Sequence, residues 1–160
     1  MSPDAVRPDD RPDDRPSDRD ATLDELEHQV AVMIRRVRRR IGERAAAVHP
    51  DLHPAAYLIL VLVADRGPVR QSTIGEVFDL DKGSVSRQVR QLEALGLVSR
   101  EPDPADGRAT LLTVTEHGRG RVEEVAQIRR VRLGERLGGW ADEELMAFVG
   151  ALARYNASLE

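Results

Sequence analysis

The sequence has no cysteine, few aromatic side chains and no long apolar segment. None of its 160 residues is Cys, and Phe, Trp and Tyr together make up 3%. The missing cysteines exclude disulfide bridges, Cys-based zinc sites and thiol chemistry, and they are compatible with a reducing compartment. The longest apolar run, residues 55–64, is too short to span a bilayer, and no pattern typical of a signal peptide is present. We therefore expect a cytoplasmic protein without membrane contact.

Acidic residues are concentrated at the beginning of the chain. The formal net charge is -4, from 24 Lys plus Arg and 28 Asp plus Glu. Residues 1–20 repeat an Arg-Pro-Asp-Asp theme, hold most of this excess charge and have almost no apolar side chain. Such a segment cannot bury enough surface to offset the entropy lost on ordering, so we expect a disordered acidic tail. The rest of the chain is nearly neutral.

The next part of the chain predicts two helices. Apolar residues recur at steps of three and four over residues 22–47, and Thr22 with Glu25 forms a capping box that is expected to begin this helix. A second helix is expected from Pro54, because proline lacks the amide hydrogen that would remain unpaired in a first turn. Its run of residues 55–64 is apolar on nearly every side and should therefore lie in the core.

The middle of the chain predicts two shorter helices and a β-hairpin. A very short strand at residues 69–70 precedes a helix expected to be capped by Ser72, and Asp81 is expected to cap the following helix. Residues 97–101 and 110–114 read as strands that flank eight turn-forming residues. The buried stripe of the second of these helices is expected to consist of Val85, Val89, Leu92 and Leu95.

The element order predicts a winged helix-turn-helix. Thr115 is expected to begin another long helix, and residues 142–144 begin a last one. Two helices joined by a tight turn and followed by a hairpin form this DNA-binding unit, whose second helix is about as wide as the DNA major groove. The expected fold class is mainly α with a small β-hairpin wing: a winged helix-turn-helix plus a helical dimerisation region.

The exposed face expected for the second helix of this unit is basic and polar. Residues 82–92 carry three cations and no acid, and Arg and Gln are the usual bidentate readers of guanine and adenine. The sequence shows no paired carboxylates, Gly-rich phosphate loop, zinc signature or Ser/His/Asp arrangement. We expect a DNA-binding protein and not an enzyme, with this face formed by Lys82, Ser84, Ser86, Arg87, Gln88, Arg90 and Gln91.

Three stretches and one arginine together resemble the MarR family of bacterial transcriptional regulators: residues 84–98, Arg100, residues 103–109 and residues 112–118. The resemblance implies a homodimer in which each subunit reads half of a pseudo-palindromic double-stranded DNA operator. With the tail at 1–20, the expected regions are a helical dimerisation region at 21–52 and 115–160 and a winged helix-turn-helix DNA-binding domain at 53–114. The chain departs from the family pattern at Lys82-Gly83, where many members have a proline and a small polar residue.

The wing carries a motif of its own. Asp106-Gly107-Arg108 matches the family's Asp-x-Arg wing tip, whose arginine enters the minor groove. A narrow A·T-rich minor groove has a strongly negative potential that attracts arginine. With these residues, the expected DNA contacts are Ser72, Lys82, Ser84, Ser86, Arg87, Gln88, Arg90, Gln91, Asp106 and Arg108.

The family further implies a ligand pocket between the dimerisation and DNA-binding regions. His53 and Tyr57 are the candidates, because their polar tips could orient a small aromatic or phenolic ligand. We expect no cofactor, and we expect a repressor that is released by such a ligand. Trp140, Phe148 and Tyr155 are expected to form a buried seam of the dimer, and Arg121, Arg129, Arg130 and Arg132 to lie on a solvated face.

Two alternative functions remain at the level of sequence. His49 and His53, with Asp51 between them, suggest a metal-responsive regulator, although the neighbouring prolines make this segment a bent loop. A dimeric protein-interaction module without DNA binding is the other alternative. The absence of proline at position 82 favours it, whereas Arg87 and the wing-tip motif argue against it.

Overall fold

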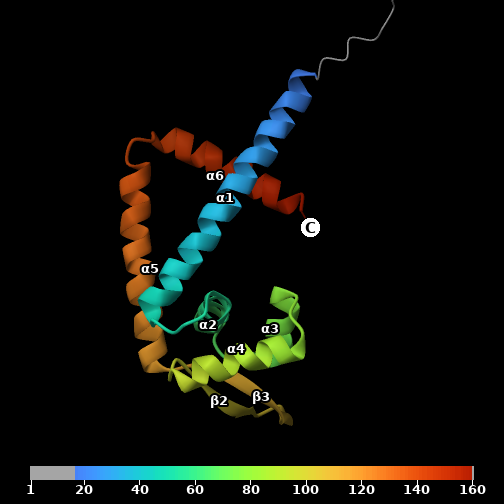
Figure 1. Cartoon of the computed structure of the whole chain (residues 1–160), viewed down its shortest axis with the longest axis vertical. Helices are drawn as coiled ribbons and strands as arrows, with labels where there is room; N and C mark the ends of the chain where they lie inside the picture. The colour runs from blue at the N-terminus through green and yellow to red at the C-terminus, as the bar shows by residue number, and fades with distance from the viewer. Residues whose placement is uncertain (1–16, 160) are drawn as a thin grey trace, which may run out of the picture. The chain divides into compact units, whose positions relative to one another are not determined.

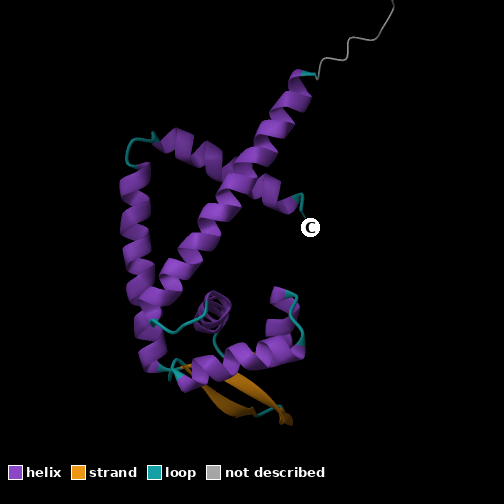
Figure 2. Cartoon of the chain, in the orientation of Figure 1, coloured by secondary structure: helices purple, strands orange, loops and turns teal. Residues whose placement is uncertain are grey.

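The computed structural model describes residues 17–159, without the side chains of Gly107 and Arg108, so most of the expected acidic tail lies outside the described residues. The chain divides into two compact units at Arg40/Ile41. Its elements (Figures 1 and 2) are α1 (Asp18–Val48), α2 (Pro54–Arg66), β1 (Val69–Arg70), α3 (Gln71–Phe78), α4 (Lys82–Ala94), β2 (Val98–Asp103), β3 (Asp106–Val114), α5 (Glu116–Leu137) and α6 (Asp142–Ala157).

Three predicted helix starts are confirmed. Pro54 is the first residue of α2. A carboxylate oxygen of Asp81 accepts a hydrogen bond from the Ser84 amide at 2.9 Å, which caps α4. The Thr115 hydroxyl likewise accepts from the Gly118 amide at 2.9 Å and caps α5. These caps satisfy amides that have no partner within the helix.

The prediction for the first helix is wrong at its start. The helix begins at Asp18, where the Ser17 hydroxyl accepts from the Asp20 amide at 3.2 Å and the Asp20 carboxylate accepts from the Ser17 amide at 3.1 Å. This reciprocal pair has the form of a capping box, five residues before the expected one. The Thr22 hydroxyl instead donates to the Asp18 carbonyl oxygen at 2.7 Å, inside the helix.

The prediction that Ser72 caps the third helix is also wrong. Arg70 is the N-cap of α3, it makes no side-chain cap bond, and Ser72 is the second helical residue. The cause is the strand that comes first. Arg70 pairs with Leu111 in the sheet, and its extended φ and ψ of -74° and 150° lead directly into the helix.

A three-stranded antiparallel sheet in the order β1-β3-β2 forms the wing. Val69 of β1 pairs with Leu112 of β3, and Val98 of β2 pairs with Val114. β2 and β3 extend beyond the predicted strands at residues 97–101 and 110–114, with a register shift between Pro102 and Asp103. The turn between them is therefore shorter than the eight residues expected, and the wing is a longer paired ribbon.

Helix α2 lies in the middle of the core, as its composition predicts. Ala56, Ile59, Leu60 and Val63 are all fully buried. This helix packs against α4, β3 and α5. Helix α2 therefore packs against the buried side of α4 and connects the winged helix to α5 within one compact unit.

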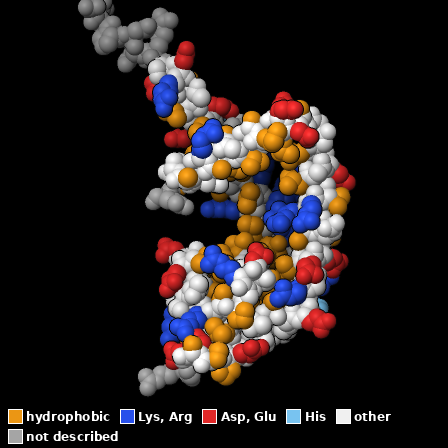
Figure 3. Space-filling view, turned by 180° about the vertical axis from the view of Figure 1, so that it is seen from behind, with side chains coloured by type: hydrophobic (Ala, Val, Ile, Leu, Met, Phe, Trp, Pro, Cys, Tyr) orange, Lys and Arg blue, Asp and Glu red, His pale blue; other side chains and the backbone are white. Residues whose placement is uncertain are grey.

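Large apolar side chains are exposed on two parts of the chain. One set lies on α1 before Arg40, and the other on the second half of α5 and on α6, where Figure 3 shows apolar side chains at the surface. The rings of Trp140 and Phe148 meet edge to face with centroids 5.6 Å apart. Trp140 and Phe148, two residues of the expected seam, are 44% and 49% exposed, respectively, in the single chain.

Candidate nucleic-acid interface

The N-terminus of α4 holds a chain of three polar side chains. The Ser84 hydroxyl donates to the Asp81 carboxylate at 2.5 Å, and its oxygen accepts from Nη2 of Arg87 at 2.8 Å. The hydrogen bonds from Ser84, and the nearby Arg87 charge, lower the pKa of Asp81 below its ordinary value. Asp81 is thus held as a carboxylate that orients Ser84, and Ser84 orients Arg87 on the exposed side of the helix.

Gly83 leaves room for this cap. A Cβ at this position would lie 3.0 Å from the Asp81 carboxylate oxygen that accepts from the Ser84 amide, and 3.7 Å from Nη1 of Arg87. Any larger residue would therefore press on the Asp81 cap. The departure from the family pattern at Lys82-Gly83 is compatible with a well-formed first turn of α4.

The expected DNA contacts of α4 differ in their exposure. Val85, Val89 and Leu92 are buried against the core, as predicted, whereas Leu95, the fourth residue of the predicted stripe, is the C-cap of α4 and is half-buried. Lys82, Arg87 and Arg90 are exposed, whereas Ser84, Ser86 and Gln88 are half-buried.

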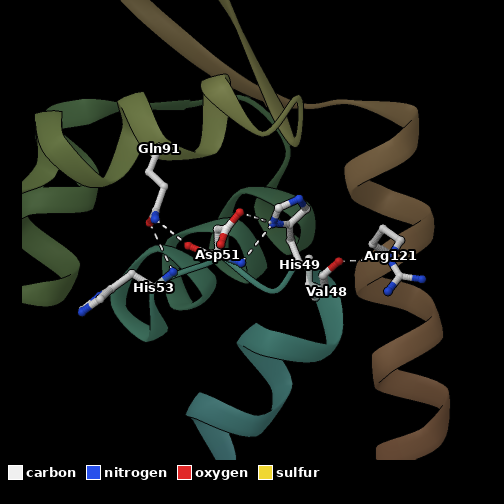
Figure 4. Close-up of polar contacts among 6 residues, drawn as sticks. All are labelled: Val48, His49, Asp51, His53, Gln91 and Arg121. Atoms are coloured by element: carbon white, nitrogen blue, oxygen red, sulfur yellow. Dashed lines mark hydrogen bonds and ion pairs between the residues drawn. The ribbon is translucent and has the colours of Figure 1, made fainter.

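Gln91 is placed differently from the other polar residues of α4. Its side-chain oxygen accepts from the His53 amide at 3.2 Å, and its side-chain nitrogen donates to the Asp51 carbonyl oxygen at 2.7 Å (Figure 4). Both ends of the amide are therefore bound to the segment between α1 and α2.

An ion pair that sequence analysis missed anchors the wing. The Asp103 carboxylate is buried and accepts from Nε of Arg70 at 2.6 Å, with Nη2 of Arg70 also in contact. The Ala105 amide donates to the same carboxylate at 2.8 Å. The bond from Ala105, followed by those from Arg70, lowers the pKa of Asp103. The two partners are 33 residues apart, so no short motif could have indicated the pair.

Two hollows flank the helices and the wing. One of about 380 Å³ lies between the start of α3 and the sheet, and Arg70, Ser72, Arg100 and Asp106 contribute to its lining. The other, of about 530 Å³, lies between α3 and α4, and Ser72 contributes to this one as well. Nε of Arg100 donates to the Glu93 carboxylate at 2.7 Å, which ties β2 to α4. The structure thus brings Ser72 to the same hollow as Asp106 of the wing. Arg108 lies on β3, two residues after Asp106.

The two candidate ligand residues have different surroundings. Tyr57 is buried, which raises the pKa of its hydroxyl, while the charges of Arg44 and Arg129 act in the opposite direction. His53 is exposed, and its Nδ1 accepts from the Ala55 amide at 3.3 Å as the cap of α2. Asp65 raises the pKa as well, so Tyr57 lies among charges of both signs, whereas His53 holds a helix start.

The segment between α1 and α2 contains the histidines considered for a metal site. Nδ1 of His49 accepts from the Asp51 amide at 3.1 Å, just as Nδ1 of His53 is used in its cap. Within residues 17–159, no three His, Asp or Glu side chains are grouped so that they could hold a metal ion. The described helices also include none that is long and apolar enough to cross a membrane.

Arg121 does not lie on a purely solvated face, and that prediction is corrected. Its Nε donates to the Val48 carbonyl oxygen at 3.1 Å, and Nη2 donates to the Ala47 carbonyl oxygen. Its remaining nitrogen pairs with Glu124. The last carbonyl groups of a helix have no partner within the helix, which gives a cation a favourable position there.

The fold and the polar face of α4 define a winged helix-turn-helix protein. Residues 51–109 match the model of the MarR family. The chain is 36% identical over 106 residues to the HTH-type transcriptional regulator YxaD of Bacillus subtilis, an alignment that covers 66% of this chain and 74% of YxaD. It is 32% identical over 96 residues to YdgJ of the same organism, with 60% and 58% of the two chains covered. The chain belongs to the MarR family of transcriptional regulators.

Solved structures show the same fold. A MarR family protein from Bacillus stearothermophilus matches with a TM-score of 0.77 at 22% identity, over 87% of this chain and 96% of the other. A MarR family transcriptional regulator from Listeria monocytogenes complexed with 26mer DNA matches with a TM-score of 0.66 at 17% identity, over 82% and 87% of the two chains. The winged-helix fold predicted from the sequence is confirmed.

Proposed function

We propose that the protein is a homodimeric, sequence-specific DNA-binding repressor that a small aromatic ligand releases from its operator. The observation that carries this proposal is Arg87, which the Asp81–Ser84 cap orients on the exposed face of α4. No acid lies between residues 82 and 92. Such a helix can enter the major groove with Arg87, Gln88 and Arg90 at bases or phosphates. A regulator of promoter DNA would act in the bacterial cytoplasm.

The wing supplies the second contact in this proposal. The Arg70–Asp103 pair and the Arg100–Glu93 pair brace the hairpin against β1 and α4. A braced hairpin presents residues 106–108 at a fixed place beside the recognition helix. Arg108 then enters the minor groove next to the major-groove site, where narrow A·T-rich sequences attract arginine.

The exposed apolar side chains support a homodimer. Groups of large apolar side chains exposed along a helix mark interaction surfaces. We assign them to contact with a second copy, which places two recognition helices about 34 Å apart, in successive major grooves. The exposed set comprises Leu23, Leu26, Met33, Ile34, Val37, Ile128, Val131, Leu133, Trp140, Met146, Phe148, Val149 and Leu159.

Sedimentation equilibrium tests the dimer. Met146 is 66% exposed on α6, and Met146→Glu should raise the dimer dissociation constant because it places a charge in the buried contact. Val77→Glu on α3 is the matched control, since Val77 is also exposed but lies in the winged helix. Equal dissociation constants for the two variants would contradict the assignment of α6 to the interface.

A gel shift on the intergenic DNA beside the gene tests DNA binding. Arg87→Ala and Arg108→Ala should each cost about 1–3 kcal/mol of specific binding, whereas Lys82→Ala should weaken binding to all sequences and lower the salt slope by about 1. Arg132→Ala on α5 is the control for loss of one exposed cation. If Arg87→Ala and Arg108→Ala both leave specific binding intact, the proposed roles are wrong.

The surroundings of Tyr57 support an anionic aromatic ligand. A buried phenol close to the charges of Arg44 and Arg129 can hold a carboxylate or phenolate in an apolar setting. Such a ligand would release DNA only to the extent that it prefers a dimer whose half-site spacing does not fit the operator. Calorimetry with benzoate as the probe should show binding that weakens in Tyr57→Phe, and no difference between the two proteins would refute this role.

A further inference from the structure

We propose that Gln91 is a positioning residue for DNA binding. It fixes the pose of α4 against the α1–α2 loop, residues 49–53. Arg121 holds the end of α1, where this loop begins, to α5. This inference rests on the proposed DNA-binding function. It assigns Gln91 a role different from that of a base reader. It also gives a physical connection between α5 and the recognition helix α4.

The first part of the argument is the geometry of the Gln91 amide. It accepts from the His53 amide at 3.2 Å and donates to the Asp51 carbonyl oxygen at 2.7 Å. Two bonds from opposite ends of one planar group fix both the distance and the rotation of the side chain. Both partners are main-chain atoms, 38 and 40 residues away in sequence. Each end of the amide keeps one further donor or acceptor position, so Gln91 could meet a base only in the plane and place that these two bonds fix.

The second part is the stiffness of the loop. The Leu52 amide donates to the His49 carbonyl oxygen at 3.0 Å, and the Asp51 amide donates to Nδ1 of His49 at 3.1 Å. Leu52 is buried in the core, and the His53 carbonyl oxygen accepts from the first turn of α2. A loop bonded internally and anchored by a buried side chain moves as a unit. Its displacement would therefore be passed to Gln91.

The third part is the attachment of the loop to α5. Arg121 donates to the carbonyl oxygens of Ala47 and Val48, the last residues of α1 before the loop. Its ion pair with Glu124 holds the guanidinium against α5. Figure 4 shows the result: Gln91 reaches the loop from α4, and Arg121 reaches its beginning from α5. A change in the position of α5 would thus be transmitted to α4 through hydrogen bonds.

Two substitutions remove the contact from opposite sides. Gln91→Met keeps the length of the side chain and removes both hydrogen bonds. His53→Pro removes the amide donor without changing α4, and the φ of -68° at His53 is one that proline adopts. His53→Ala is the matched control, because it removes the imidazole cap of α2 and retains the amide that Gln91 binds.

The experiment measures binding to a duplex selected from a random pool by the unsubstituted full-length protein, and to an unrelated duplex of equal length. Gln91→Met should bind the selected duplex about tenfold more weakly, because fewer molecules hold α4 in the competent pose. Its base preference, determined by repeated selection, should be unchanged. His53→Pro leaves the bond to the Asp51 carbonyl oxygen and should show part of this loss. The double variant should be no weaker than Gln91→Met, and His53→Ala should bind as the unsubstituted protein does.

Relaxed preference at one base position in Gln91→Met, together with unchanged binding by His53→Pro, would overturn the inference and make Gln91 a base reader. Amide hydrogen exchange of residue 49 and residues 51–53 gives a readout without DNA. It should be faster in Gln91→Met than in His53→Ala, and equal rates would also overturn the inference. If the unsubstituted protein selects no duplex, the proposed function fails, and exchange alone still decides whether Gln91 holds the loop.

Discussion

Gly118 occupies a place where the chain tolerates no side chain. It lies in the first turn of α5, and a Cβ built on it would stand 2.2 Å from the carbonyl oxygen of Leu97 and 3.1 Å from the Leu97 Cα. Leu97 immediately precedes β2, and its carbonyl oxygen also accepts from the Thr115 amide at 3.1 Å. Gly118→Ala would therefore force α5 away from the start of the wing.

Two opposing effects determine the size of this change. Alanine in place of glycine in a helix favours folding by about 0.8–1 kcal/mol. Forcing an extra carbon into a filled site typically costs about 1–3 kcal/mol, and this contact is with main-chain atoms that cannot rotate away. The clash also opposes the cap, because Thr115 bonds the Gly118 amide and donates to the Gly96 carbonyl oxygen at 2.7 Å. Because the clash is with main chain, we expect the upper end of this balance: Gly118→Ala should lower the free energy of unfolding by about 2 kcal/mol.

Gly120→Ala is the matched control for this measurement. Gly120 lies two residues further along α5, and a Cβ there would meet nothing within 4 Å. It should gain about 0.5–1 kcal/mol of stability from helix propensity alone. Urea unfolding at one fixed protein concentration measures both variants, since the stability of a dimer depends on concentration. If Gly118→Ala were as stable as Gly120→Ala, the close approach of α5 to Leu97 would not exist as described.

Three further predictions concern the wing, the core and a cap. The lowered pKa of Asp103 means that its ionised form stabilises the fold. This stabilisation is complete above the ordinary carboxyl pKa of about 4 and is lost as the pH falls through the lower folded value, so acid titration of unfolding should show a smaller pH dependence in Asp103→Asn. Leu60 is fully buried, and Leu60→Ala should cost about 2–5 kcal/mol in urea unfolding. Thr115→Ala should cost about 0.5–2 kcal/mol by loss of the α5 cap, whereas Thr115→Ser should retain most of the stability.

Local chemistry made much of the fold predictable. Asp81, Thr115 and Pro54 begin their helices as expected, because a cap or a first-turn proline acts within three or four residues of sequence. The continuous apolar run of α2 likewise requires burial wherever the helix is placed. The error at the first helix has the same origin. Ser17 with Asp20 offers a reciprocal cap like the one expected from Thr22 and Glu25, and sequence pattern alone does not rank two such caps.

The parts of the site that sequence reasoning missed depend on contacts between distant residues. Arg70 meets Asp103 because β1 joins the wing sheet, and Arg121 meets the end of α1 from 73 residues away. Gln91 has the spacing of an exposed residue on α4, yet its amide turns toward the loop. Helical periodicity gives the face on which a residue lies, but it does not give the neighbour that a flexible polar side chain binds.

Ion pairs between arginines and acidic residues explain how a chain with a negative net charge can present a basic surface to DNA. Asp103 and Glu93 lie close to the candidate interface. Asp103 is bonded to Arg70 and Glu93 to Arg100, so each pair contributes little to the electrostatic potential at the interface. Asp81 is held in the cap beside Arg87. The cations of α4 therefore act on DNA with less opposition than the net charge of -4 suggests. The partly exposed Arg100–Glu93 pair is worth little stability, so its larger effect is to hold β2 against α4 and to neutralise an acid beside the site, whereas the buried Asp103 carboxylate also stabilises the fold.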